Sequence, residues 1–194
     1  MTTAQSSTSQ TTGLPEAGIW AIDTAHSSVE FVVRHLMMAK VRGSFTDFSG
    51  TIEIGETPET SSVEVEIQVA SVSTRDAQRD GHLTSPDFFD AEAHPTIGFR
   101  STAVRDRGGN NYAVDGDLTL LGTTKPVTLG LTYQGTARDP WGNDKAVFSA
   151  EAEIDREAWG LTWNQALETG GVLVGKKAKI EIEVEAVKPA PSDG

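Results

Sequence analysis

The densest group of residues that could do chemistry lies in one short segment, from Thr74 to Phe89. An arginine followed by an aspartate occurs twice, at Arg75 and at Arg79, and His82 comes soon after. We expect Thr74 to cap a short helix, and on a helical turn Arg75 and Arg79 would share a face. Because arginine suits two-point contacts with phosphate or carboxylate, the segment predicts an anion site. The alternative is a helix held by its own ion pairs or clamped to its neighbours.

Motifs for the common kinds of catalysis are absent from the sequence. The chain has no cysteine nucleophile, no Gly-x-Ser-x-Gly turn, no Walker loop and no dinucleotide fingerprint. Its four histidines are scattered, without a His-x-His or i, i+4 pair, so we expect no metal site and no cofactor. One enzyme hypothesis stays open, in which His35 or His82 acts as a general base.

Aromatic and methionine residues outside the regular pattern point to apolar space. Phe88 and Phe89 follow a proline in a segment without alternation, so they must pack in a core or line a pocket. Met38 follows an alternating stretch, and its flexible side chain suits irregular or adaptable apolar surroundings. Trp159 and Trp163 lie four residues apart, and packing in the core or at its rim is the simpler interpretation.

The elements that must position these residues follow from alternation of apolar and polar side chains, which is typical of half-buried strands. It is clear at 29–33, 63–69, 127–133 and 180–184, and weaker at 45–54, 97–104, 112–120 and 146–154. A short entry strand fits 19–23. Short turns at 108–111 and 139–144 favour hairpins over helical crossovers. The sequence therefore predicts an all-β antiparallel barrel, with one or two short helices inserted around residues 74–90.

Charge and the chain ends limit the partners. Lysine and arginine number 16 and aspartate and glutamate 28, giving a net charge of −12, so the surface should repel nucleic acid and anionic membranes. No run of 18 apolar residues exists, which predicts no transmembrane segment. Residues 1–18 and 188–194 are expected to be tails around a domain at 19–187. The N-terminus lacks the pattern of a secretory signal, which favours the cytoplasm.

Several short segments together resemble the YceI-like family, the polyisoprenoid-binding, lipocalin-like barrel proteins. The resemblance runs from about Trp20 to Val187, and it depends on the order and spacing of the pieces. The pieces are Trp20-Ala-Ile-Asp23, His26-Ser27-x-Val29-x-Phe31-x-Val33-x-His35, Val41-x-Gly43-x-Phe45, Thr74-Arg75-Asp76-x-x-Arg79-Asp80-x-His82-Leu83, Ser85-x-Asp87-Phe88-Phe89-Asp90, Gly116-Asp117-Leu118-Thr119, Arg156-x-x-Trp159-Gly160 and Glu168-x-Gly170-Gly171.

The resemblance implies an eight-stranded up-and-down barrel whose lumen holds a polyprenyl chain, a polyprenyl pyrophosphate, an isoprenoid quinone or a similar amphiphile. It also implies a homodimer. An eight-stranded barrel has room for one slim ligand. Within this picture we expect Arg75, Arg79 and His82 to hold the polar head. The full set of expected ligand-binding residues is Phe31, Val33, His35, Met38, Phe45, Arg75, Arg79, His82, Phe88, Phe89, Trp159 and Trp163.

Three functions remain open on the sequence. The first is a lipid-binding protein without catalysis, for carriage, storage or sensing. The second is an enzyme that modifies a bound lipid. The third is an interaction module whose barrel is packed solid.

Overall fold

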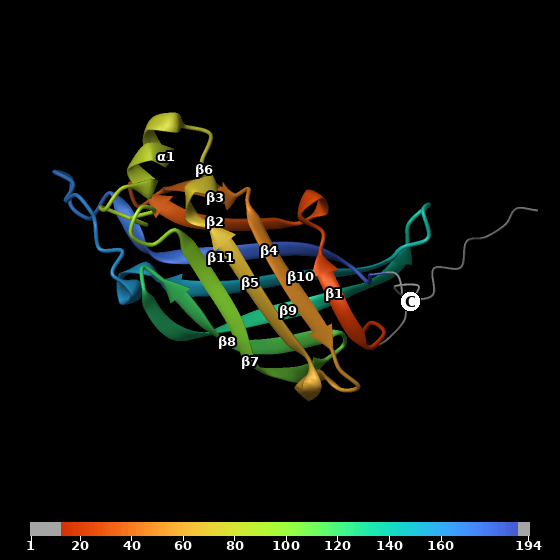
Figure 1. Cartoon of the computed structure of the whole chain (residues 1–194). Helices are drawn as coiled ribbons and strands as arrows, with labels where there is room; N and C mark the ends of the chain where they lie inside the picture. The colour runs from red at the N-terminus through yellow and green to blue at the C-terminus, as the bar shows by residue number, and fades with distance from the viewer. Residues whose placement is uncertain (1–12, 190–194) are drawn as a thin grey trace, which may run out of the picture.

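Within residues 13–189, which the computed structural model describes, eleven β-strands form one antiparallel sheet. A single α-helix and four 3-10 turns accompany them in this part of the chain (Figure 1). The elements are β1 (Gly18–Ile22), η1 (Thr24–His26), β2 (Ser28–His35), β3 (Ala39–Phe45), β4 (Phe48–Ile54), η2 (Pro58–Thr60), β5 (Ser62–Gln68), η3 (Val69–Ser71), β6 (Val72–Ser73), α1 (Ala77–Thr84), β7 (Thr96–Gly108), β8 (Asn111–Leu120), β9 (Thr123–Arg138), β10 (Asp144–Asp155), η4 (Arg156–Trp159) and β11 (Val174–Val187).

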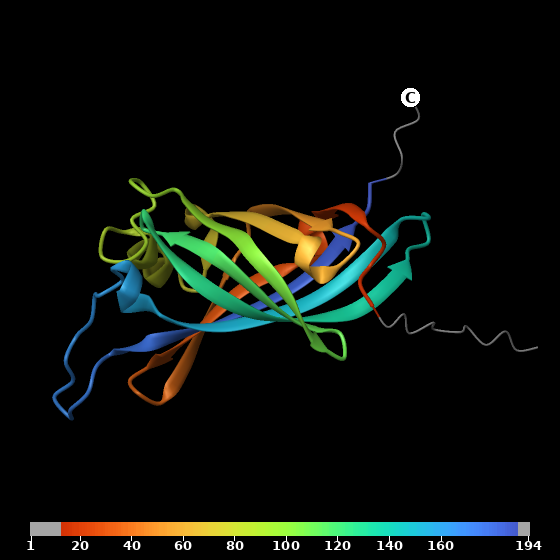
Figure 2. The same ribbon diagram turned by 90° about the horizontal axis from the view of Figure 1, so that it is seen from below.

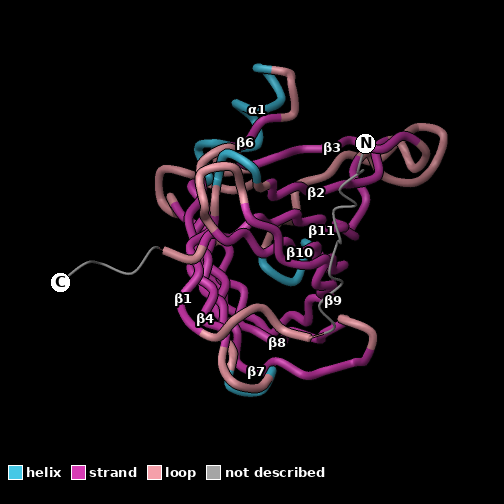
Figure 3. The backbone as a smooth tube through the Cα atoms, turned by 90° about the vertical axis from the view of Figure 1, so that its right-hand side faces the viewer, coloured by secondary structure: helices cyan, strands magenta, loops and turns pink. Residues whose placement is uncertain are grey.

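The eleven strands fill eight positions around a closed ring, because three positions each hold an interrupted pair of strands. β1 and β2 both pair with β11, while β4 pairs with β1 and β3 pairs with β2. β5 and β6 continue the third position beside β4 and β3. The ring closes where Ala21 pairs with Val187 and Ile22 with Ala186. Figure 3 views the barrel approximately along its axis, so that the strands are seen around the ring. The predicted eight-stranded up-and-down barrel is confirmed.

Alternation along the strands places apolar side chains inside the barrel and charged ones outside. On β11, Ile180 and Ile182 line the interior. Between them, Glu181 faces outward and accepts a hydrogen bond from Arg42 at 2.5 Å. Lys179, also outward, contacts Glu151 at 2.9 Å. The outer face is therefore covered by cross-strand ion pairs, and the inner face is left to hydrophobic packing.

The barrel has two distinct ends (Figure 2). At the helix end lie α1 and the connections 36–38, 74–95, 121–122 and 156–173. At the terminal end the described chain begins and stops, and Gly13 N–H donates to Asn110 in the β7–β8 turn. A hydrophobic cluster containing Trp20, Tyr133 and Phe148 packs near the terminal end. A second cluster, containing Phe88 and Trp159, packs near the helix end.

The helix forms in the predicted segment, but it begins later than expected. Its N-cap is Asp76, whose carboxylate accepts from the Arg79 N–H, and not Thr74. Arg75 therefore precedes the helix, with a left-handed φ of 63°. The prediction that Arg75 and Arg79 share a helical face is wrong. The physical reason is that aspartate caps a helix well, while Thr74 is buried and bonded to Asp80.

Two further parts of the chain differ from expectation. Residues 39–45 form a full strand, β3, whereas the alternation was recognised only from residue 45 onward. Residues 13–18, expected in the N-terminal tail, are described, and Leu14 packs against the cluster at the terminal end. The remaining tail residues, 1–12 and 190–194, lie outside the described part of the chain. In residues 13–189, no helix is both long enough and apolar enough to cross a bilayer.

Candidate ligand-binding lumen

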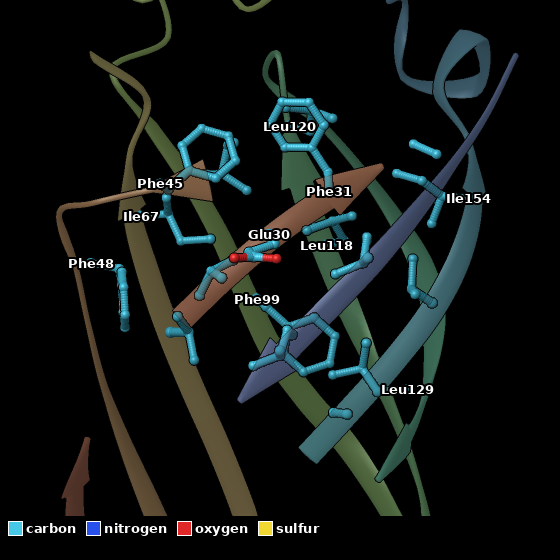
Figure 4. Close-up of a pocket in the computed structure, with 18 of the residues that line it drawn as sticks. Glu30, Phe31, Phe45, Phe48, Ile67, Phe99, Leu118, Leu120, Leu129 and Ile154 are labelled. Carbon is cyan, nitrogen blue, oxygen red and sulfur yellow. The ribbon is translucent and has the colours of Figure 1, made fainter. Parts of the chain in front are cut away.

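The two hydrophobic clusters do not fill the barrel, and a cavity of about 660 Å³ lies inside it. This volume is within the range of roughly 300–1,000 Å³ that is usual for small-molecule sites. Inward-facing side chains from every position of the ring form its wall. Figure 4 shows part of this wall, with Phe31, Phe99 and Leu129 among the labelled side chains. Apolar wall residues from the strands include Phe48, Ile67, Phe99, Leu118, Leu129 and Ile154. The alternative of a barrel packed solid is therefore wrong.

Two inward-facing glycines keep the aromatic rings of the wall close to the sheet. A Cβ at Gly43 would lie 2.2 Å from the ring of Phe31, which is its partner across β2 and β3. A Cβ at Gly116 would lie 2.3 Å from the ring of Phe99. Each ring thus covers a glycine on the neighbouring strand. Because glycine has no side chain, each ring can lie in the space that a Cβ would take. The rings therefore stay against the wall and do not project across the lumen.

Three phenylalanines form one aromatic group toward the helix end of the lumen. The ring centroids of Phe31 and Phe45 are 5.7 Å apart, and Phe89 contacts both rings edge-on at 6.3 and 5.7 Å. Phe89 comes from the segment after α1, so the insertion packs directly onto the barrel wall. These distances are typical of favourable aromatic pairs.

Arg79 is held in place beside the lumen by Thr74. Its Nε–H donates to Thr74 Oγ1 at 2.7 Å, and Nη2 donates to the Thr74 carbonyl at 2.9 Å. Thr74 Oγ1 in turn donates to Asp80 Oδ1 at 2.6 Å. Because these bonds use one edge of the guanidinium, its Nη1 hydrogens remain available to an anion. Arg79 is a wall residue of the cavity.

His82 lies one turn farther along α1 and also belongs to the wall. Its Nε2 is 2.9 Å from Asp87 Oδ2. The imidazole meets Phe88 and Trp163 edge-on, with ring centroids 5.0 and 4.7 Å apart. The ring is therefore oriented by both a carboxylate and two aromatic neighbours.

Arg156 is a polar wall residue that sequence reasoning missed as a site residue. It is 4% exposed, and it donates to three main-chain carbonyls, those of Gly175, Leu161 and Val174. Burial lowers the pKa of its guanidinium, although the nearby Glu157 and Asp155 act in the opposite direction. These bonds tie the 156–173 connection to the start of β11. Its position in the Arg156-x-x-Trp159 segment was the available signal.

The structure brings together most, but not all, of the predicted site residues. Phe31, Val33, His35, Phe45, Arg79, His82, Phe88, Phe89 and Trp163 line the cavity. Three others do not reach the wall. Arg75 is exposed before the helix, Met38 is exposed at the tip of the β2–β3 hairpin, and Trp159 is buried with its indole N–H donating to the Leu118 carbonyl at 3.1 Å. Strand residues of the wall such as Ile67 and Phe99 were missed, although their alternation signalled an inward face.

A carboxylate cluster at the terminal end resembles a metal site only in composition. Asp23, His26 and Glu185 lie close enough in the described structure to share a cation. The ammonium of Lys145 already lies among them, 2.7 Å from Asp23 and 2.9 Å from Glu185. The Lys145 hydrogen bond is the main reason that the pKa of Asp23 falls to about 2. The place that a cation would take is therefore already filled by a side-chain ammonium of the protein.

Comparison with known proteins decides the family. The family model described as "YceI-like domain" matches residues 20–186. The chain belongs to the YceI-like family. A UPF0312 protein of Staphylococcus aureus is 36% identical over 169 residues, covering 86% of this chain and 95% of the relative.

Solved structures of YceI-like proteins share the barrel. Burkholderia cenocepacia BcnA superposes with a TM-score of 0.74 at 25% identity, covering 84% of this chain and 98% of BcnA. A polyisoprenoid binding domain from Saccharophagus degradans, implicated in plant cell wall breakdown, gives a TM-score of 0.65 at 14% identity. That match covers 88% of this chain and 98% of the domain, and it demonstrates the shared fold. This YceI-like chain thus has the family barrel with an open interior.

Proposed function

We propose that this YceI-like protein binds one long-chain isoprenoid amphiphile in the barrel lumen and does not transform it. The observation that carries the proposal is the cavity of about 660 Å³, whose wall is built mainly from aliphatic and aromatic side chains. Each buried methylene contributes about 0.8 kcal/mol, so a long hydrocarbon chain gains enough to offset the cost of ordering it. The likeness to a polyisoprenoid binding domain supports the same ligand class.

The wall also favours one orientation of such a ligand. Arg79, His82 and Arg156 belong to the helix end of the cavity, while Trp20 and Phe148 pack near the opposite end. We therefore place a phosphate or pyrophosphate head at the helix end, against the free edge of Arg79, with the tail toward the terminal end. An arginine at this place suits an anionic head, because guanidinium–phosphate contacts are strong and directional.

Replacement of Arg79 tests this orientation. Arg79→Gln should weaken binding of a polyprenyl phosphate about tenfold or more, since a hydrogen bond to a charged group contributes roughly 1.5–3 kcal/mol. Binding of the uncharged polyprenol of equal length should change little. Both affinities can be measured by titrating ligand in detergent micelles against tryptophan fluorescence.

Arg75→Gln is the matched control, because Arg75 is an exposed arginine outside the wall. It should leave both affinities unchanged. Equal binding of the phosphate by the parent and by Arg79→Gln would contradict the proposed head-group site. Failure of the parent to bind either isoprenoid would contradict the proposed function itself.

A further inference from the structure

The β2–β3 hairpin ends in a continuous apolar tip, Leu36-Met37-Met38. The three residues are 42%, 55% and 79% exposed. The other large hydrophobic residues exposed to this degree in residues 13–189 are Ile19 and Trp141, and both belong to the opposite end of the barrel. Exposed apolar groups of this kind mark surfaces that bind a partner.

The tip is also held in an unfavourable backbone conformation. Leu36 and Met37 have φ angles of 52° and 63°, and the Met38 N–H donates to the His35 carbonyl at 3.2 Å. This is a tight hairpin turn whose two central positions normally hold asparagine or glycine. Large apolar residues at such positions weaken the turn, and strain of this kind is concentrated at functional sites.

The tip lies beside the helix end of the lumen. The preceding residue, His35, is part of the cavity wall, and so is Leu173, whose carbonyl accepts from the Leu36 N–H at 2.9 Å. The hairpin and the 156–173 connection project from the same end of the barrel (Figure 2). An apolar surface that bound the tip would therefore lie next to the helix end of the cavity.

Charges around the tip favour a phospholipid surface as that partner. Arg34 and Lys40 flank the apolar residues and are exposed, and residues 34–40 contain no acidic group. On the neighbouring connection, Glu168 is an exposed opposing charge. Lys176, at the start of β11, is paired with Glu157 at 2.9 Å and so adds no free positive charge. The net charge of −12 acts weakly here, because salt screens charges beyond roughly 8–10 Å under physiological conditions. Basic residues flanking apolar ones suit a layer of phosphates above hydrocarbon.

We propose that the Leu36–Met38 tip inserts into a phospholipid bilayer and brings the mouth of the lumen to the membrane surface. This proposal rests on the proposed function, since an isoprenoid amphiphile is itself a component of bilayers. The hairpin would allow the ligand to pass between membrane and lumen with little exposure of its tail to water.

Vesicle flotation tests the proposal, using phosphatidylcholine–phosphatidylglycerol vesicles and the full chain. Met38→Ser should weaken vesicle binding about tenfold, and Met37→Ser with Met38→Ser about a hundredfold, because burial of each large apolar side chain is worth at least one factor of ten. Lys40→Gln should weaken it roughly fivefold. Trp141→Ser is the matched control, since Trp141 is 85% exposed at the opposite end, and it should change nothing.

Uptake of polyprenyl phosphate from detergent micelles separates this proposal from the proposed function. Unchanged uptake from micelles, together with slower uptake from vesicles by the double methionine variant, supports membrane docking. Equal vesicle binding by the parent and the double variant overturns it. A second result also overturns it: the parent is a dimer, and the double variant becomes a monomer without losing vesicle binding. The tip would then bind a second copy of the chain. Lack of uptake from micelles by the parent overturns the proposed function instead, whatever the flotation result.

Discussion

Single residues decide the shape of the lumen, and Gly43 is the clearest case. Phe31 lies over this glycine, so the sheet makes room for the ring at the wall. A methyl group at residue 43 would occupy the place of the ring and push it toward the lumen. The same relation holds between Gly116 and Phe99, on the opposite part of the ring of strands.

Gly43→Ala should therefore narrow the lumen and destabilise the protein. Overpacking of this kind costs about 1–3 kcal/mol, and we expect a similar loss in isoprenoid binding free energy. Urea unfolding and micelle titration measure the two effects. Gly98→Ala is the matched control, because Gly98 is also a strand glycine and a Cβ there meets nothing within 4 Å. If both substitutions behave alike, the glycine–phenylalanine pair does not shape the lumen.

Residue identity alone could predict part of the candidate site. Arg79, His82, Phe88 and Phe89 were recognised because unusual residues gather in a segment without alternation, and they do line the cavity. Arg75 was misplaced, because the spacing of four between Arg75 and Arg79 suggests a shared helical face. Which residue caps the helix depends on burial of Thr74, and burial is a tertiary property.

At the scale of elements, the corner between β1 and β2 is fixed to the neighbouring strand β11 and to β10 beside it. Asp23 caps η1 and binds Lys145 of β10, and its main-chain N–H donates to the Glu185 carbonyl at 2.8 Å. Because the chain turns at this corner, β1 and β2 can both pair with β11, each along a different part of that strand. The two short strands together thus fill one position of the closed barrel. The ion pair is partly shielded, since the side chain of Asp23 is 20% exposed.

The corner predicts a pH dependence of stability. The hydrogen bond from Lys145 lowers the pKa of Asp23 from 3.8 to about 2, partial burial acts against it, and His26 assists. A carboxyl whose pKa is lowered by folding stabilises the fold fully when the pH is above its pKa in the unfolded chain. This contribution is lost as the pH falls through its pKa in the folded protein. Asp23→Asn should therefore cost roughly 1–2 kcal/mol at pH 6, allowing for partial exposure.

This difference from the parent should shrink between pH 4 and pH 2, the window between the two pKa values of Asp23. Urea unfolding of both proteins across this range measures it. Lys179→Gln provides a comparison, since Lys179 contacts Glu151 on the exposed outer face and the loss of such a surface pair should change the stability little at any pH in this range. A difference between parent and Asp23→Asn that stays constant down to pH 2 would contradict the account.

The strands were predictable because alternation is a local signal, and all eight positions of the ring correspond to predicted segments. β3 was missed because Gly43 and the charged residues Lys40 and Arg42 hide its inward face. The break between β3 and β4 and the pairing of β1 with β11 depend on partners distant in the chain. No pattern within one strand reports such partners.

At the scale of the whole molecule, the barrel keeps its interior open because packing is concentrated at both ends. Trp20 and Tyr133 are almost fully buried in one cluster, and Val69 in the other. Neither sequence alternation nor composition predicts this distribution. A strand has the same alternation of apolar and polar residues whether its inward face lines a cavity or packs in a core. The cavity is the observation that supports the proposed ligand binding.

The most direct test of lumen binding blocks the lumen itself. Ile182 lies in the wall at the middle of β11, and the next residue, Glu183, is exposed on the outer face. Ile182→Trp should fill the passage, whereas Glu183→Trp adds the same ring outside the barrel. After incubation with polyprenyl phosphate, native mass spectrometry should find one lipid per chain in the parent and in Glu183→Trp, and none in Ile182→Trp. Equal lipid occupancy in all three proteins, or no lipid in the parent, would contradict binding within the lumen.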